Sequence, residues 1–313
     1  MNTFQEMFDL KLSKLLSNQK GVLISGQNVD VGSHISGLSG VLRQESIKST
    51  HTILNNPNIE TSLIGINLGY LLASKATKCS CIFVKQADFL TLMMDDLVHT
   101  VNLLSTMDFD YSLNIFTFVV DSGFEGPQSR WDAVSSLEES CNIKVIHLHN
   151  YESLSSLKQL GEQGARIFLI SQKYFKYPIY VNSGDFLLEK QTVFCLGFSI
   201  HDSTGPKLGF EKLFGNISDS NLIAVSHRHD LDLNLIKKIL NEQQLVKIVD
   251  NSADSRASCL KFLDYLSSFN LPFSYELFAA SDRKKYCGIN EEKYQYSLMF
   301  KGNIHKAGTV YFK

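Results

Sequence analysis

The sequence predicts an α/β protein with a doubly wound, mostly parallel sheet, followed by a second, smaller α/β domain. Short apolar runs of strand length alternate with longer segments whose apolar residues have helical spacing. The 313 residues exceed one typical domain. A hydrophobic content of 44% with 20% charged residues is typical of a globular protein with sizeable cores. The alternation breaks near residue 183, which predicts domains at 1–182 and 183–313.

The predicted elements of the first domain alternate along the chain. Helices are expected at 4–17, 59–70, 90–104, 131–140 and 152–163, and strands at 21–26, 81–84, 114–120, 143–148, 166–171 and 179–181. Such alternation predicts a parallel sheet with helices on both faces. The loops that follow three strands, at 26–38, 85–89 and 121–129, should then gather at the carboxyl edge of the sheet, where these folds bind ligands.

The second domain is predicted from a renewed alternation after residue 221. Strands are expected at 222–225 and 246–249, and helices at 231–241 and 257–269. The segment 183–215 is rich in Gly, Ser, Asp and Lys and is interpreted as a connection or an irregular domain start. The C-terminal residues are expected to form a looser tail.

Composition and charge argue against several classes of protein. The formal net charge is −2 and the basic residues are scattered, so no nucleic-acid footprint is expected. The apolar runs are too short to span a bilayer, and residues 1–20 have the pattern of an amphipathic helix rather than a signal peptide. Six cysteines form no Cys-x-x-Cys pair, which favours reduced, buried thiols in a cytoplasmic protein without a metal site. Cys79 and Cys81 are expected on opposite faces of a strand.

The most informative stretch is 55–70. A polar loop that contains Pro57 precedes apolar residues at helical spacing, so a helix with one buried face should begin one or two residues before Glu60. Gly65 and Gly69 share one stripe of this helix, which lets another backbone approach closely. Glu60 then lies in the first turn. It either complements the helix dipole or serves as a functional acid beyond the helix N-terminus.

Four motifs, taken in order, resemble the pyrimidine-binding domain of thiamine-diphosphate enzymes, in the arrangement of transketolase and the β subunits of 2-oxo-acid dehydrogenases. The segment 22–29 resembles the opening strand and Gly-Glu-Asp-Val turn, with Gln27 and Asn28 in place of the two acids. The segment 59–66 resembles the family's segment with the cofactor-activating glutamate. The segment 86–89 resembles its Gln-aromatic-Ala-Asp-aromatic stretch, and the segment 123–129 resembles its Gly-x-x-Gly-Pro-Thr-His turn. The second domain is more weakly similar to the transketolase C-terminal domain.

The resemblance implies that Glu60 activates thiamine diphosphate by sharing a proton with the far nitrogen of its aminopyrimidine ring, a role that suits an acid partly shielded from water. The ring also needs an apolar shelf, which Phe83 or Phe89 would supply; alternatively, both phenylalanines belong to the core. The family's usual stacking position aligns with Gln86. Gln86 and Asp88 would line the pocket, or else cap the helix that follows them.

Two departures from the family pattern bear on activity and assembly. The histidine that the family often places in the 123–129 turn is replaced by Ser129, and His34 is the only histidine that we nominate as a substitute. The sequence also contains no Gly-Asp-Gly…Asn motif, with which the family holds the diphosphate and Mg²⁺. The resemblance therefore implies an α-type partner subunit that bears the diphosphate-binding domain, with two copies of each chain.

The sequence thus favours a β-type subunit of a two-component thiamine-diphosphate enzyme that makes or breaks a C–C bond next to a carbonyl, in a 2-oxo acid or a ketose. Dehydrogenase and transketolase types remain open. The rival hypothesis is a catalytically degenerate relative that serves as a structural or regulatory partner. A third, weaker alternative is a carbohydrate- or nucleotide-binding α/β protein, which would leave the position of Glu60 unexplained.

Overall fold

The fold is described from a computed structural model. The described residues are 3–27, 29, 45–56, 59–74, 78–107, 109–119, 134–141, 143–171, 175, 186–197, 220–243, 245–250, 252, 255–281 and 295–305. The chain divides into two compact units, one formed by Met1–Trp131 and Ser136–Val181 and the other by Asp132–Ser135 and Asn182–Lys313. Each unit contains one sheet with helices packed against it, so the predicted α/β class is confirmed.

The first unit is built on a six-stranded, all-parallel sheet in the order β2-β1-β3-β4-β6-β5. Its strands are β1 (Leu23–Gly26), β2 (Thr52–Asn55), β3 (Cys79–Val84), β4 (Ser112–Val119), β5 (Lys144–Leu148) and β6 (Gly164–Ser171). The central strands β3 and β4 are buried throughout, as expected for a parallel sheet covered on both faces.

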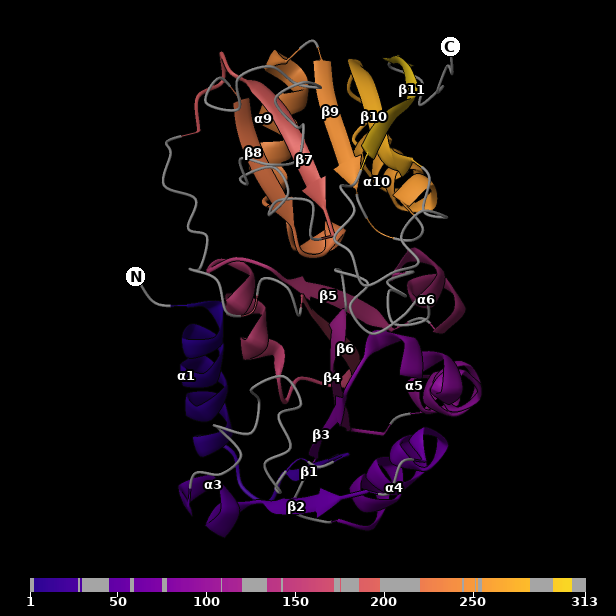
Figure 1. The fold of residues 1–313 in the computed structure, drawn as a ribbon. Coiled ribbons are helices and arrows are strands. Elements are labelled where there is room, and N and C mark those ends of the chain that lie inside the picture. Colours follow the sequence, from indigo (N-terminus) through magenta and orange to yellow (C-terminus); the bar gives the residue numbers. More distant parts are fainter. Residues whose placement is uncertain are drawn as a thin grey trace. The chain divides into compact units, whose positions relative to one another are not determined.

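Helices cover both faces of this sheet (Figure 1). One face carries α1 (Phe4–Ser17), α3 (Glu45–Thr50) and η4 (Ser153–Gln159). The other face carries α4 (Glu60–Ala73), η1 (Ala87–Met93), η2 (Asp96–Val101), α5 (Asn102–Thr106) and α6 (Val134–Cys141). The sheet is therefore doubly wound, as predicted.

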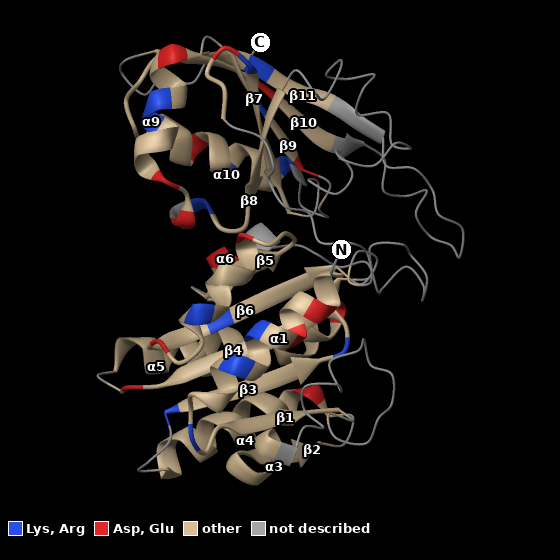
Figure 2. Cartoon of the chain, turned by 90° about the vertical axis from the view of Figure 1, so that its left-hand side faces the viewer, with Lys and Arg blue, Asp and Glu red and all other residues tan. Residues whose placement is uncertain are grey.

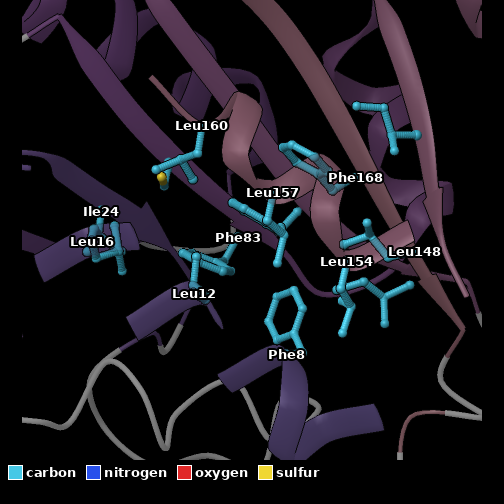
Figure 3. Packing of buried hydrophobic residues seen from close by; sticks show 14 of the residues in the cluster. Phe8, Leu12, Leu16, Ile24, Phe83, Leu148, Leu154, Leu157, Leu160 and Phe168 are labelled. Atoms are coloured by element: carbon cyan, nitrogen blue, oxygen red, sulfur yellow. The ribbon is translucent and has the colours of Figure 1, made fainter. Parts of the chain in front are cut away.

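The face under α1 is apolar and aromatic. Thr3 caps the helix through a reciprocal pair of hydrogen bonds with Glu6, at 3.2 and 2.8 Å, and the buried residues recur every four positions from Phe4 to Leu16. Figure 3 shows Phe8 and Leu12 directed at Phe83 of the sheet, with side chains of η4 beside them. The rings of Phe83, Phe116 and Phe168 form a stack, with centroids 5.0 and 4.9 Å apart.

The second unit contains a five-stranded sheet in the order β11-β10-β9-β7-β8. Its strands are β7 (Gln191–Leu196), β8 (Ser220–Val225), β9 (Leu245–Asp250), β10 (Phe273–Ser281) and β11 (Gln295–Ile304), of which only β11 runs antiparallel to its neighbour. Its helices are η6 (Arg228–Asp230), α9 (Leu233–Glu242) and α10 (Ser255–Ser267). In both units the described acidic and basic residues are interspersed (Figure 2).

Several elements differ from the expectations drawn from the sequence. The segment 183–215 contains the buried strand β7, and the expected tail contains β10 and β11. The expected helix at 90–104 consists of 3₁₀, π and α segments and begins at Ala87, and the expected helix at 152–163 is the 3₁₀ helix η4. The expected strand at 179–181 lies outside the described residues.

The five cysteines among the described residues, at positions 79, 81, 141, 195 and 259, are buried and form no disulfide bond with one another. The expectation that Cys79 and Cys81 lie on opposite faces of a strand is wrong: both belong to the core beneath α1, because side chains two positions apart share a face. None of the described helices is long and apolar enough to cross a membrane.

Candidate functional site

The carboxyl ends of β1 and β3 form a topological switch point. In the order β2-β1-β3-β4, the connection from β1 leads to one side and the connection from β3 leads to the other. Open α/β sheets bind ligands in the crevice outside the strands at such a point. Gln27 follows β1 directly, and Gln86 lies two residues after β3, so both lie at this edge of the sheet.

Gly26 brings the ends of three strands together. Its carbonyl accepts a 2.9 Å hydrogen bond from the backbone N–H of Asn56, just after β2, and its register partner on β3 is Phe83. Gly26 has φ +155°, and a Cβ at this position would lie 2.4 Å from the Phe83 carbonyl oxygen. Only glycine permits this close approach. The backbone that leads into Gln27 is therefore fixed from both sides.

Glu60 is the first residue of α4 and points toward the switch point. Its Oε1 accepts a 2.5 Å hydrogen bond from Nε2 of Gln27, whose side chain is only 9% exposed, whereas Glu60 itself is partly exposed. The helix was expected to begin one or two residues earlier, but Ile59 is the N-cap and forms no side-chain cap. Glu60 thus lies in the first turn, where an acid also complements the helix dipole.

Two further side-chain hydrogen bonds join α4 to β1 and to the residues just before it. Asn67, which is fully buried, donates to the Ser25 hydroxyl at 2.6 Å and to the Leu63 carbonyl at 2.7 Å. Tyr70 donates to the Gly21 carbonyl at 2.9 Å. Together with the Gln27–Glu60 pair, these contacts run from the carboxyl to the amino end of β1. They fix the register of α4 against the strand and hence the position of Glu60.

Asn56 contributes an unsatisfied polar group near this edge. Its side chain is 7% exposed, and neither its Nδ2 nor its Oδ1 has a hydrogen-bond partner within the described part of the chain. A buried amide without partners is costly and requires an explanation, such as a ligand or water that completes it. The sequence offered no means to single out Asn56, because its burial follows from the packing of β1 and β2.

The remaining predicted site residues, in β3 and just after it, have different environments. Phe83 is 5% exposed and lies within the aromatic stack of the core, as the core alternative expected (Figure 3). Gln86 is buried at the N-cap of η1 without a side-chain capping bond, and its carbonyl accepts from the Phe89 N–H at 3.1 Å. Asp88 and Phe89 lie in the first turn of η1 and are partly exposed.

His34, Asn28 and Ser129 lie outside the described residues. Among the residues that the structure describes, no group of three or more His, Cys, Asp and Glu side chains is arranged to hold a metal ion.

The fold is that of a transketolase-like α/β protein. A chain of a solved structure, the split-gene transketolase described as an inactive β4 tetramer, matches with a TM-score of 0.62 and 10% sequence identity, covering 92% of this chain and 94% of that chain. At this identity the likeness establishes the fold alone. No family model matches the sequence, and no curated protein matches it significantly.

Proposed function

We propose that this chain is the β-type subunit of a two-component thiamine-diphosphate enzyme that makes or breaks a C–C bond adjacent to a carbonyl, in a 2-oxo acid or a ketose. In this proposal 1–182 is the pyrimidine-binding domain and 183–313 is the transketolase C-terminal-like domain. The observation that carries it is the place of Glu60: the acid predicted from the sequence begins α4 and meets Gln27 at the switch point of a transketolase-like sheet.

The residues at the switch point suit an aminopyrimidine ring. Such a ring presents nitrogen acceptors and an amino donor, and Asn56 offers a buried amide donor and acceptor that no described residue satisfies. Glu60 supplies the carboxyl group, with Oε1 held by Gln27. These features support the proposal that the residues at this edge of the sheet face the cofactor.

When bound, thiamine diphosphate supplies a carbanion at its thiazolium carbon. The task of Glu60 is to hold a proton between its carboxyl group and the far ring nitrogen, which makes Glu60 the catalytic residue of this chain. Phe89, whose ring is partly exposed, is the better candidate for the stacking shelf, because Phe83 packs within the core. Gln86 and Asp88 would line the pocket, and His34 would handle protons on the substrate oxygen.

The proposal requires a partner, because the diphosphate and Mg²⁺ would be held mainly by an α-type subunit, with two copies of each chain. The outer face of α4 supports a subunit contact. Cβ atoms added at Gly65 or Gly69 would meet nothing within 4 Å, and the same helix exposes Ile59, Ile66 and Leu72 by 53%, 38% and 57%. An uncharged, apolar helix face of this kind is typical of an interface.

The second candidate is a catalytically degenerate relative that acts as a structural or regulatory partner. Two observations favour it: amides occupy positions 27 and 86, and the solved structural neighbour is an inactive assembly. A neighbouring reading frame with the Gly-Asp-Gly…Asn signature would favour the enzyme.

The decisive experiment is co-purification with the product of that neighbouring frame, calorimetric titration of thiamine diphosphate with Mg²⁺, and measurement of proton exchange at the thiazolium carbon. Glu60→Gln should retain cofactor binding and lower the exchange rate roughly 100-fold or more, because proton transfer by a positioned acid contributes about that much. Glu242→Gln, at the exposed end of α9, is the matched control and should change neither quantity.

The possible outcomes separate the two candidates. Unchanged exchange in Glu60→Gln would refute the catalytic role of this residue. A complex that forms but does not bind thiamine diphosphate would favour the degenerate relative.

A further inference from the structure

We propose that Gln27 is a positioning residue for Glu60: its amide holds one carboxyl oxygen, so that the other faces the ligand with the proton. This inference rests on the proposed function. It assigns the residue that orients the carboxyl group of Glu60, and it follows from the placement of two side chains that lie 33 positions apart in the sequence.

The first step is the fixed origin of the Gln27 side chain. The Gly26 carbonyl accepts a hydrogen bond from Asn56 on one side, and Gly26 lies against the Phe83 carbonyl on the other. The carboxyl end of β1 therefore cannot shift without breaking these contacts. With 9% exposure, the Gln27 side chain has little freedom to turn toward solvent. Its amide is therefore presented to α4 in one arrangement.

The second step is the fixed origin of Glu60. About two and three helical turns after Glu60, the Asn67–Ser25 and Tyr70–Gly21 hydrogen bonds hold α4 against β1 and the residues just before it. Glu60 is the first residue of α4, directly after the N-cap Ile59. The 2.5 Å contact between Gln27 Nε2 and Glu60 Oε1 thus joins two groups whose backbones are both held in place.

The third step is the chemistry of the pair. An amide N–H donates a hydrogen bond and has no proton to lose, so Oε1 of Glu60 must act as acceptor and cannot carry the acidic proton. The proton that Glu60 shares with a ring nitrogen is then confined to Oε2. A carboxyl group at position 27 would instead compete for that proton or repel the carboxylate. Gln27 therefore determines which carboxyl oxygen of Glu60 carries the shared proton.

The test begins with the free chain, in which no cofactor is needed. The side-chain amide protons of Gln27, observed by ¹⁵N-edited NMR and assigned with Gln27→Met, should move clearly when Glu60 is changed to Gln, because the acceptor loses its charge. The side-chain amide of Gln19, which donates to the Leu160 carbonyl at 3.1 Å, is the internal control and should not move. A Gln27 signal that is insensitive to Glu60→Gln would overturn the pairing.

The second arm uses the complex with the partner subunit, thiamine diphosphate and Mg²⁺. Gln27→Met keeps the length of the side chain and removes the donor. Its cofactor Kd should stay within about twofold while proton exchange slows about tenfold or more, since a hydrogen bond to a charged group is lost. In the Glu60→Gln background, Gln27→Met should have no further effect. Gln19→Met is the matched control.

The outcomes show whether Gln27 positions Glu60 or has only a structural role. If Gln27→Met slows exchange equally with and without Glu60, or weakens cofactor binding to the same degree, the residue acts by another route and the proposal falls. If the unmodified complex does not bind thiamine diphosphate, the proposed function fails and this role fails with it. The NMR result would still show whether the pair exists, so the two failures are separable.

Discussion

The two 14-residue helices α1 and α4 lie on opposite faces of the first sheet and distribute their polar groups in opposite ways. Helix α1 directs four apolar side chains at the sheet and carries Glu6, Lys11 and Lys14 on its other faces. Helix α4 directs polar Glu60 and Asn67 at β1, and its outer face carries exposed Ile66 and Leu72 without a charge.

The two helices therefore differ in whether their contacts with the sheet mainly stabilise the fold or also fix the position of a side chain. The contacts under α1 are dispersion and hydrophobic contacts, which tolerate small shifts because they are non-directional. The contacts under α4 include short, directed hydrogen bonds that fix one helix register. The contacts beneath α4 therefore combine the burial of apolar residues such as Leu63 and Leu68 with hydrogen bonds that set geometry, whereas the contacts beneath α1 are apolar and aromatic.

The largest expected loss of stability comes from the aromatic face. Phe116 lies between Phe83 and Phe168 in the stack and is fully buried, so Phe116→Ala should lower the free energy of unfolding by about 3–5 kcal/mol. Urea titration followed by circular dichroism would measure the change. Leu10→Ala, at a 63% exposed position of α1, should stay within about 0.5 kcal/mol. A similar loss for both variants would contradict the assignment of the core.

Asp9 is the exception on α1 and gives a pH-dependent prediction. Burial raises the pKa of its carboxyl group from 3.8 to about 7, and its Oδ1 has no hydrogen-bond partner among the described residues. The folded chain holds this proton more tightly than the unfolded chain. The contribution of Asp9 to the free energy of unfolding is therefore close to zero below pH 4, becomes increasingly unfavourable as pH rises from about 4 to 7, and remains unfavourable above pH 7. Asp9→Asn should therefore add roughly 2–4 kcal/mol at pH 8, after allowance for the exposed part of the side chain.

The measurement for Asp9 is the difference between the unfolding free energies of Asp9→Asn and the unmodified chain across pH 4–8. The difference is needed because His51 works in the other direction. Burial lowers the pKa of His51, so its contribution to stability is fully present above pH 6.5 and is lost as pH falls below that value toward the lowered pKa. A difference that does not change with pH would show that Asp9 is not the group responsible.

Much of the first sheet could be predicted because buried parallel strands appear as continuous apolar runs, as in β3 and β4. Strand β2 was missed because it is a four-residue edge strand in which Thr52 and Leu54 are exposed, so its pattern carries little signal. Strand β7 was missed because its short apolar run stands within a polar segment. Its strand structure depends on pairing with β8 and β9 on either side, which the sequence does not show.

At the candidate site, the sequence could single out Glu60 because it is the only charge in a helix of otherwise uncharged residues. It could not pair Glu60 with Gln27, because nothing local links residues on a strand end and a helix start. Asn67 did leave a signal, a polar residue on an apolar helix face, but the strand that satisfies it is known only from the fold. Whether Phe83 faces the core or a ligand likewise depends on which helix covers its face.

Removal of a hydrogen bond beneath α4 should cost less stability than Phe116→Ala but should lower function more. Asn67→Ala removes the bonds to Ser25 and Leu63, so the free energy of unfolding should fall by about 1–3 kcal/mol. If α4 sets the position of Glu60, cofactor proton exchange in the complex should fall as well. Ser25→Ala is the matched control: the double variant should be less destabilised than the sum of the single ones. Strict additivity would show that the two side chains do not act together.

The smallest expected effect has the opposite sign. Gly65 lies inside α4 with nothing within 4 Å of an added Cβ, so Gly65→Ala should stabilise the free chain by about 1 kcal/mol through helix propensity. If a partner subunit packs against this face, the same methyl group should weaken association, because the glycine stripe permits close backbone approach. Thermal unfolding should therefore show a more stable free chain, while the Kd for the partner should rise because the affinity falls. Stabilisation without any loss of affinity would show that the partner binds elsewhere and that the apolar outer face of α4 needs another explanation.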